Sequence, residues 1–402
     1  MRALVVLGTR PEAIKLGPVV HALRARGDVD VQVCVTGQHR EMVQPLLELF
    51  DLRPDHDLQL MKPNQDLASL SAAALCGVTR VLDETRPAWV IVQGDTTTAF
   101  AAALAAFYRG VRVAHVEAGL RTHDLAHPFP EEMNRQVVDL VSSLHFAPTE
   151  RARANLLRDG TDPASVHVTG NTVIDALRSV LGRADGAPEQ PTTADGKRIV
   201  LVTAHRRESF GPGFVGICDA LRRIASEFTD VRVVYPVHLN PNVRGPVQER
   251  LGGHPRITLL PPLEYAALVR LMWRSTLVLT DSGGIQEEAP SLGKPVLVLR
   301  DTTERPEAVE AGCARLVGTD ADRIVAETRL LLTDTQEYAR MARVANPFGD
   351  GHASERIAET LCSAGAAEVM VSPTPMKRSH ASEAESASSN EVRDTEPNVA
   401  VN

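Results

Sequence analysis

The sequence predicts an α/β protein in which two doubly wound domains follow one another, and three observations support this fold class. Short apolar runs rich in β-branched residues recur without polar alternation, a pattern typical of strands buried on both faces of a parallel sheet. The segments between these runs are long enough for helices. After a Gly-, Pro- and Thr-rich segment at residues 183–197, the same pattern begins again.

The first half begins with the clearest strand and helix of the chain. An apolar run is followed by Gly8, and Pro11 stands near the start of a segment with apolar residues at helical spacing, which predicts a strand, a glycine turn and a helix. We place the first domain at residues 1–175. Its predicted strands are 2–7, 31–36, 88–92, 111–116, 144–147 and 166–169.

The second domain is placed at residues 176–352, and a helix near residues 353–362 is expected to complete the first domain. From about Ser363 onward Ala, Ser, Glu, Pro and Asn dominate, so residues 363–402 are predicted to be a disordered tail. Ligands of such sheets bind beyond the carboxyl ends of the strands, which predicts a cleft where the two domains face each other. The predicted strands of the second domain are 198–203, 231–236, 256–260, 276–280, 295–299 and 314–317.

The composition narrows the class of partner. The chain has 402 residues, of which 43% are hydrophobic and 23% charged, as in ordinary soluble proteins. A net charge of −8 provides no general attraction for nucleic acid or anionic lipid, so an anionic ligand has to be met by a local cluster of cations. Neither a membrane-length apolar run nor a signal peptide is present, and we expect a cytoplasmic protein without nucleic-acid or membrane partners.

The stretch from residue 280 to residue 305 predicts an anion site. A buried strand ends in Asp-Ser-Gly-Gly at residues 281–284, and a helix is expected from there to residue 293. Two glycines allow close approach of the backbone, and the N–H groups of a first helical turn attract phosphate. Arg300 and Arg305 follow the next strand, where they could meet a diphosphate. The alternative is that Asp-Ser-Gly-Gly is only a capped turn.

The carboxylates near this site have two possible roles. Glu287 or Glu288, in the first turns of the same helix, could accept the hydroxyl groups of a ribose. In the first domain Asp95, Glu117 and Glu131 follow strands that end at one edge of the sheet, where grouped carboxylates can exchange protons with a substrate. Asp95 is equally suited to cap the helix after it, and Glu131 to stabilise a first helical turn.

Histidines and arginines follow two strands of the second domain. His205 comes directly before Arg206, which places an imidazole and a cation at the expected mouth of the cleft, and His238 follows the next strand. A solvated basic turn is the alternative for His205. No His or Asp pair has metal-ligand spacing, and neither a G-x-G-x-x-G nor a P-loop motif follows a strand, so we expect no metal and no cofactor.

Taken together, the motifs resemble those of the non-hydrolysing UDP-N-acetylglucosamine 2-epimerases of bacteria. The segments GTRPEAIK, TGQHREM, GDTTT, HVEAGLRT, PEEMNR, GNTVIDAL, HRRESFG, YPVHLNPNVR and DSGGIQEEAPSLGKPV occur in one order, and the resemblance extends from about residue 1 to residue 361. It implies two Rossmann-like domains of the glycosyltransferase-B type, facing each other across a cleft, in a protein that is usually dimeric. The residues it implies for nucleotide binding are Arg10, His205, Ser282, Gly283, Gly284, Glu288 and Arg305.

The resemblance also implies the chemistry. Asp95, Glu117 and Glu131 would form the acid–base group, with Glu288 on the ribose and Lys15 near the sugar and diphosphate. A base would remove the proton at C2 while UDP leaves C1, giving 2-acetamidoglucal, and re-addition would invert C2. Together with the carboxylates, His205 would be catalytic by stabilising the leaving UDP.

The expected reaction thus interconverts UDP-N-acetylglucosamine and UDP-N-acetylmannosamine for surface polysaccharide synthesis. A hydrolysing epimerase, a glycosyltransferase of the same fold and a non-catalytic nucleotide-sugar sensor remain alternatives.

Two departures from the family pattern concern binding. Many relatives carry an aromatic residue near the uracil where this chain has Leu268, so base stacking is expected to be weaker. Some relatives have a second nucleotide-sugar site that Gln38, Glu131, Arg206 and His238 of this chain fit, but Asn64 stands where that site has an arginine. Activation by substrate is therefore left open.

Overall fold

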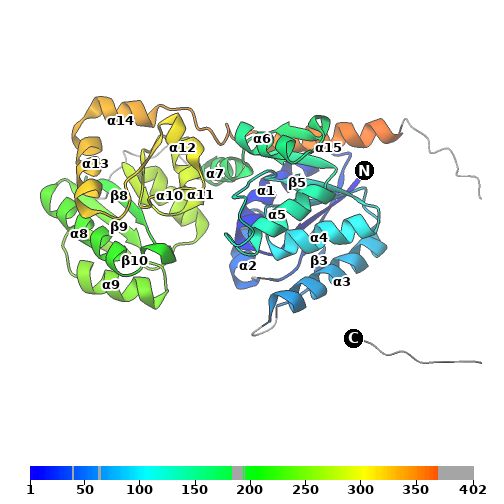
Figure 1. Cartoon of the computed structure of the whole chain (residues 1–402), viewed down its shortest axis with the longest axis horizontal. Coiled ribbons are helices and arrows are strands. Elements are labelled where there is room, and N and C mark those ends of the chain that lie inside the picture. Colours follow the sequence, from blue (N-terminus) through cyan, green and yellow to red (C-terminus); the bar gives the residue numbers. More distant parts are fainter. Residues whose placement is uncertain (39, 62–64, 183–192, 194, 370–402) are drawn as a thin grey trace, which may run out of the picture.

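The computed structural model describes residues 1–38, 40–61, 65–182, 193 and 195–369. These residues form two parallel sheets with helices on both faces, arranged as two lobes side by side (Figure 1). The fold class expected from the sequence is confirmed.

The N-terminal sheet has the doubly wound order β3-β2-β1-β4-β5-β6-β7 among the described residues. The order in which the strands are added changes direction between β1 and β4, which are parallel neighbours with Ala3 paired to Trp89. The strands are β1 (Arg2–Leu7), β2 (Asp30–Val35), β3 (His56–Asp57), β4 (Trp89–Gln93), β5 (Arg112–Val116), β6 (Leu144–Ala147) and β7 (Val166–Val168). The helices of this half are α1 (Arg10–Ala25), α2 (Arg40–Leu49), α3 (Leu67–Thr85), α4 (Thr97–Tyr108), α5 (Glu131–Val141), α6 (Glu150–Arg158) and α7 (Thr172–Gly182), with the 3-10 helix η1 (Pro163–Ser165).

The C-terminal sheet repeats this order as β10-β9-β8-β11-β12-β13 in the described part of the chain. Here the order of the strands changes direction between β8 and β11, which are parallel neighbours with Leu277 paired to Val200. The strands are β8 (Arg198–Thr203), β9 (Val231–Pro236), β10 (Ile257–Leu260), β11 (Leu277–Thr280), β12 (Val296–Val298) and β13 (Ala314–Leu316). The helices are α8 (Pro212–Glu227), α9 (Pro241–Leu251), α10 (Tyr265–Arg274), α11 (Gly283–Glu288), α12 (Pro306–Ala311), α13 (Ala321–Thr333) and α14 (Thr335–Ala342), with η2 (Arg207–Ser209) and η3 (Ala289–Leu292).

The strands form where the sequence places continuous apolar runs, because both faces of each sheet are covered by helices. Val5, Ile91, Leu201 and Leu279 are fully buried in the centres of the two sheets. The sequence analysis missed β3, which has only two residues, lies at the sheet edge and lacks an apolar run. Proline starts several helices, as at Pro11, since its missing N–H has no partner to lose at a first turn.

Two crossings connect the lobes. Helix α7 packs against α1 of the first lobe and against α10 and α11 of the second. The predicted boundary between residues 175 and 176 falls within this helix. The chain returns at α15 (Ala353–Val369), which packs against α1 and α7 and lies with the N-terminal lobe in Figure 1.

Two expectations about helices need correction. The tail predicted to be disordered from residue 363 begins inside α15, because its Ala-rich sequence continues an existing helix to Val369. Residues 370–402 lie outside the described part. The helix expected from residue 283 to residue 293 is α-helical only to Glu288 and continues as η3, since Pro290 cannot donate a helical hydrogen bond.

Candidate active site

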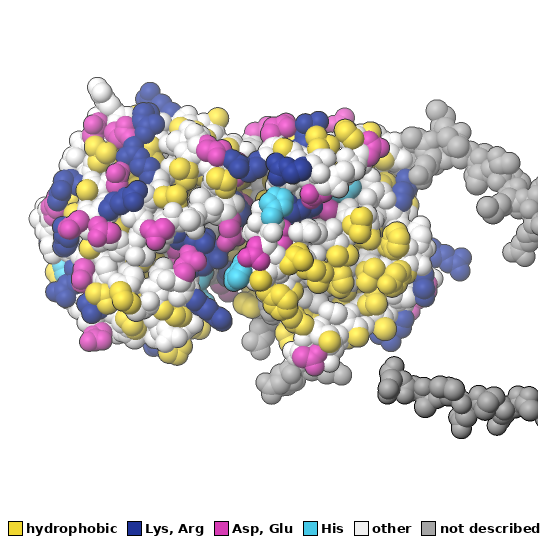
Figure 2. All heavy atoms as spheres, viewed as in Figure 1, with side chains coloured by type: hydrophobic (Ala, Val, Ile, Leu, Met, Phe, Trp, Pro, Cys, Tyr) yellow, Lys and Arg dark blue, Asp and Glu magenta, His cyan; other side chains and the backbone are white. Residues whose placement is uncertain are grey.

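A cavity of about 360 Å³ lies between the two lobes, at the carboxyl ends of strands from both sheets. Its lining begins with Arg10 and Lys15 after β1, continues with His205 after β8, and includes Ser282 and Gly284 after β11. These strands flank the point of reversal in each sheet, where doubly wound folds bind ligands. Charged side chains and histidines gather along the groove between the lobes (Figure 2).

The start of α11 forms one wall of the cavity, and its side chains do not cap it. The Ser282 side chain makes no cap hydrogen bond with the described residues, and the buried Asp281 carboxylate instead accepts the N–H groups of His205 (2.6 Å) and Arg206 (2.7 Å). A Cβ built on Gly283 or Gly284 would find its nearest neighbour only at 3.8 or 3.7 Å. The alternative of a turn capped by its own side chains is therefore wrong, and the helix start remains available to an anion.

Two cations face this helix start. Arg305 lines the cavity and forms an ion pair with the buried Glu287. Burial lowers the pKa of Arg305, but Glu287 and Glu117 outweigh that effect and raise the pKa above its ordinary value, so the guanidinium stays charged. Arg10 is the exposed first residue of α1 on the opposite wall.

Glu117 lies behind the N-terminal wall in a strained and fully hydrogen-bonded position. Its φ of 67° is uncommon for a residue with a Cβ, and such outliers cluster at functional sites. Both carboxylate oxygens accept from Lys15 Nζ at 2.6 Å, and the amides of Gln93 and Asn171 donate as well. Burial raises the pKa of Glu117, but Lys15, Arg305 and these hydrogen bonds outweigh it and lower the pKa below its usual value.

Asp95 follows β4, and Glu117 follows the neighbouring strand β5, but the Asp95 side chain pairs with a different residue. Its carboxylate accepts from Arg135 Nε at 3.0 Å, and Arg135 also pairs with the buried Glu132 at 3.1 Å. The helix after Asp95 is capped by Thr96, so the capping role considered for Asp95 is wrong.

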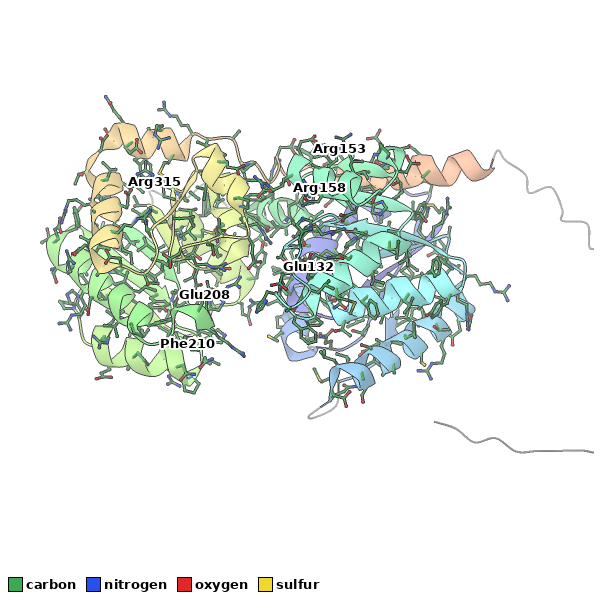
Figure 3. The ribbon with its side chains drawn as sticks, viewed as in Figure 1. Glu132, Arg153, Arg158, Glu208, Phe210 and Arg315 are labelled. Atoms are coloured by element: carbon green, nitrogen blue, oxygen red, sulfur yellow. The ribbon has the colours of Figure 1, made fainter. Side chains whose placement is uncertain are left out.

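Glu131 is the first residue of α5. Of the two neighbouring glutamates Glu131 and Glu132, it is Glu132 that is buried. Figure 3 shows Glu132 at the edge of the N-terminal lobe that faces the other lobe, where Glu208 lies opposite. None of the three carboxylates, Asp95, Glu117 and Glu131, is in the described lining of the cavity, but Glu117 pairs with Lys15, which lines it.

Glu288 and Tyr265 form a second polar pair in the cavity wall. Burial raises the pKa of Glu288 to about 8, although the Tyr265 hydroxyl donates to its Oε2 at 3.0 Å and opposes the shift. Leu268 lies in the same wall, at the position that the sequence comparison with the family singles out. The sequence leaves Glu287 and Glu288 as alternatives, and the structure separates them: Glu287 pairs with Arg305, whereas Glu288 faces Tyr265.

The His205 ring stacks on His238, with ring centroids 5.4 Å apart. Burial lowers the pKa of His205, the Asp281 carboxylate opposes this, and the positive charge of neighbouring side chains adds to the lowering. These effects together lower the pKa of His205 below its ordinary value. Its partner His238 lines the main cavity, so this residue of the second site implied by the family belongs to the same space.

The other described residues that the family implies for that second site are Gln38, Glu131 and Arg206. Gln38 follows β2, and its amide oxygen accepts a hydrogen bond from Thr98 Oγ1 at 2.9 Å. Arg206 forms an ion pair with Glu304, with Nη1 and Oε1 3.8 Å apart. Asn64 lies outside the described residues.

Sequence analysis missed Asn171, Tyr265 and Glu132. Asn171 and Tyr265 stand beside the strongest motifs, in GNTVIDAL and PLEY, but an amide or a phenol carries no signal of its own until the fold brings it to a carboxylate. Glu132 adjoins Glu131, and only burial distinguishes the two.

Within residues 1–369, apart from the gaps, no three His, Cys, Asp or Glu side chains are arranged to hold a metal ion. The helices among these residues also include none that combines the length and the apolar character needed to cross a membrane.

Comparison with known proteins places this geometry in context. The family model described as UDP-N-acetylglucosamine 2-epimerase matches residues 21–362. The chain is 53% identical to the UDP-N-acetylglucosamine 2-epimerase of Escherichia coli K12 over 369 residues, covering 90% of this chain and 98% of the relative.

Solved structures agree. The UDP-GlcNAc 2-epimerase of Neisseria meningitidis, solved bound to UDP-GlcNAc, superposes with a TM-score of 0.82 at 46% identity, over 90% of this chain and 100% of the other. A glycotransferase of kitacinnamycin is only 14% identical, and its TM-score of 0.62, over 90% of this chain and 98% of the other, shows a shared fold alone.

Proposed function

Because the chain belongs to the UDP-N-acetylglucosamine 2-epimerase family, we propose that it interconverts UDP-N-acetylglucosamine and UDP-N-acetylmannosamine without releasing the free sugar. One observation carries this proposal: a single cavity is lined both by residues at the uncapped start of α11 and by Lys15 of the other domain, whose ammonium group pairs with Glu117. The first feature suits a diphosphate, and the second suits proton chemistry on the sugar attached to it.

In this proposal the C-terminal domain holds UDP. The N–H groups of Gly283 and Gly284 bind the diphosphate, because no side chain caps this helix start. Ser282 lines the same wall, and its own N–H already donates to Thr280 Oγ1 at 3.0 Å. Arg10 and Arg305 supply positive charge from opposite walls. Glu288 accepts the ribose hydroxyls. We propose residues 1–175 with the C-terminal helix as the acid–base domain and residues 176–352 as the nucleotide domain, with α7 shared between them.

The chemistry begins with removal of the C2 proton by a carboxylate. The electrons of the C2–H bond form the C1–C2 double bond of 2-acetamidoglucal, and the C1–O bond breaks as UDP leaves. Addition of UDP to C1 and of a proton to the opposite face of C2 then gives the manno isomer. His205, Arg10 and Arg305 stabilise the charge that develops on UDP.

Glu117 is the carboxylate best prepared to act as base. Its hydrogen bonds and the two nearby cations favour the charged form. In this proposal Asp95 and Glu131 are the other members of the acid–base group. Lys15 fixes the Glu117 carboxylate and lies beside the sugar and diphosphate.

Proton NMR of UDP-N-acetylglucosamine in D2O with the purified protein tests the proposal. We expect deuterium at C2 and growth of UDP-N-acetylmannosamine without an acceptor. Free N-acetylmannosamine in its place would identify a hydrolysing enzyme. A C2 proton that stays unchanged while the sugar nucleotide binds would favour the glycosyltransferase or the sensor.

Glu117→Gln gives a matched test of the proposed roles. It keeps the shape of the side chain but removes the basic group, so we expect kcat to fall at least about 100-fold. The dissociation constant for UDP, measured by calorimetry, should stay within about twofold, because UDP is held mainly by the other domain and Glu117 does not line the cavity. Loss of UDP affinity in a folded variant would contradict this division of labour.

We further propose that the protein is a cytoplasmic homodimer that supplies surface polysaccharide synthesis. Support for the dimer comes from hydrophobic side chains on the face over α4 and α5 of the N-terminal lobe (Figure 2). On these helices Phe107, Tyr108 and Leu140 are 57%, 61% and 82% exposed. Exposed apolar groups of this size mark an interaction surface.

The second nucleotide-sugar site implied by the family is a separate proposal. Arg206 and His238 lie on the rim of the C-terminal domain, but Gln38 is engaged with Thr98 on the other domain. The number of UDP-N-acetylglucosamine molecules bound per chain at saturation tests it directly. Two equivalents would support the second site, and one equivalent would contradict it.

A further inference from the structure

Asn171 lies where the two crossings between the lobes touch. Its backbone N–H donates to the carbonyl oxygen of Phe348 on the returning segment at 2.7 Å. Next to it, a Cβ built on Gly170 would lie 3.2 Å from the Cα of Gly349, and Gly170 has a φ of 89°. Only glycines allow the two backbones to approach this closely without strain. Asn171 is therefore fixed to both crossings.

The Asn171 side chain joins carboxylates from the two domains. Its Oδ1 accepts the N–H of Val173 at 3.1 Å, which leaves Nδ2 to face the acidic groups. Nδ2 donates to Glu117 Oε1 and to Glu287 Oε2, each at 3.2 Å. Ionised carboxylates only accept hydrogen bonds, so the chemistry itself fixes the orientation of the amide. The residue is 2% exposed, and water cannot readily replace it.

We infer that Asn171 is a positioning residue that couples the arrangement of the interdomain crossings to the orientation of the Glu117 carboxylate. The inference rests on the proposed function, in which Glu117 takes part in proton transfer. One amide holds Glu117 of the first sheet and Glu287 of the second, so a shift of the crossings displaces the hydrogen bond that both share. Glu117 is thereby aligned only when the two domains are correctly placed.

The charges around Glu117 define what the loss of this amide would do. Lys15 from α1 and Arg305 from the segment before α12 favour its ionised form, Glu287 from α11 faces it across the amide, and Gln93 from β4 donates a further hydrogen bond. The hydrogen bond from Asn171 lowers the pKa of Glu117. Removing the donor raises that pKa, and a negative charge in its place raises it further.

The test compares two substitutions at Asn171 with one at the same crossing. Asn171→Ala removes the donor, whereas Asn171→Asp keeps the size of the side chain and the acceptor for Val173. Asn346→Ala is the comparison at the same crossing. Its amide donates to the main chain of Glu287 and to the Ser291 hydroxyl, and its oxygen accepts the N–H of Phe348, but it donates to no described side-chain carboxylate and leaves the Asn171–Phe348 backbone hydrogen bond in place. The steady-state rate and its pH profile are measured for each variant, with thermal unfolding and UDP affinity.

We expect kcat of Asn171→Ala to fall about tenfold at pH 7, the effect of one lost hydrogen bond to a charged group, with KM within about twofold. The acidic limb of the kcat profile should move to higher pH in Asn171→Ala and further in Asn171→Asp, and stay in place in Asn346→Ala. UDP affinity should be retained.

A purely structural Asn171 would lower the melting temperature and leave the acidic limb unmoved, and this result overturns the inference. Failure of both Asn171 variants to fold overturns it as well. Absence of C2 deuterium exchange in the unchanged protein is a different result, because it rejects the proposed function itself.

Discussion

Opposite charges from both domains alternate at and behind the cavity wall, and their pairing explains how they can be buried. Lys15 pairs with Glu117, and Arg305 pairs with Glu287, with all four side chains at most 15% exposed. An isolated ion at such a depth costs several kcal/mol, so each pair depends on both partners. A diphosphate that reaches Arg305 must share it with Glu287. The uncapped α11 start and the exposed Arg10 supply the additional attraction.

Glu288 predicts a pH dependence of UDP binding. Its pKa is raised to about 8, so most of the free protein carries it protonated at pH 7. Ribose hydroxyls donate to the charged form, and UDP binding should therefore release a proton from this residue. As the pH rises, a larger fraction of the free protein has the Glu288 carboxylate already ionised. The affinity for UDP should therefore increase by up to about tenfold per pH unit between about pH 6 and pH 8, and then level off.

Calorimetry in buffers of different ionisation enthalpy measures the released proton. Glu288→Gln is the control: it should bind UDP more weakly and lack this proton, while the ionisation of UDP itself contributes equally to both proteins. Equal proton release by both proteins would remove Glu288 from the ribose.

At the scale of elements, α11 shows why a short helix can be the centre of a site. It has six residues, begins with two glycines and gives way to η3 at Pro290, so it contributes little stability of its own. Its position is set instead by β11 before it and by Ile285, which packs into the core. Burial from behind leaves its first turn open toward the cavity.

Gly284→Ala separates helix stability from ligand space. The residue has a φ outside the left-handed region, and a Cβ there meets the protein only at ordinary contact distance. Alanine is the better helix former by about 1 kcal/mol, so the melting temperature should stay the same or rise. UDP affinity should fall at least about tenfold, because the new methyl group occupies the space that a phosphate needs.

Gly245→Ala is the matched control for this test. Gly245 lies within α9, and nothing lies within 4 Å of the added Cβ. Its affinity for UDP should be unchanged. If Gly284→Ala binds UDP as tightly as Gly245→Ala does, the diphosphate does not lie at the start of α11.

At the scale of the whole molecule, the described residues join two similar sheets by two crossings, and further contacts between the domains lie to one side of these crossings. Thr149 donates to Glu307 at 3.0 Å, and Arg151 pairs with Glu310, both between α6 and α12. Mostly polar, partly exposed contacts of this kind are weak, so the relative placement of the domains depends on the crossings near Asn171.

The apolar face over α4 and α5 predicts the oligomeric state. We expect the protein to have twice the 43.5 kDa mass of one chain when measured by light scattering during size exclusion. Phe107→Glu combined with Leu140→Glu places charges on this face and should halve the mass, because charges at the centre of an interface remain unpaired.

Leu330→Glu is the control for the dimer prediction. Leu330 is an exposed leucine of α13 on the other domain, 37% exposed, and its substitution should leave the mass unchanged. A single-chain mass for the unchanged protein, or a dimer that survives both charges, would contradict the proposed interface.

Much of the architecture could be predicted from the sequence because the signals are local. Strands 2–7, 144–147, 198–203 and 231–236 match the structure to the residue, since an uninterrupted apolar run bounded by polar turns is itself the cause of a buried parallel strand. Pro11 marked the start of α1 for a similarly local reason. The two-residue β3 and the helical start of the tail lacked such a signal.

The sequence by itself determined the fold class, the order of its elements, the family and the chain positions at which polar groups follow strands. Only the tertiary structure decided what those groups touch. It placed Asp95 against Arg135 and Glu117 against Lys15. It also brought Asn171 between Glu117 and Glu287, two carboxylates that are 287 − 117 = 170 residues apart in the sequence. The reason is physical: strand and helix formation follow from neighbouring residues, whereas burial, ion pairing and the pKa of a carboxylate depend on groups that meet only after the chain has folded.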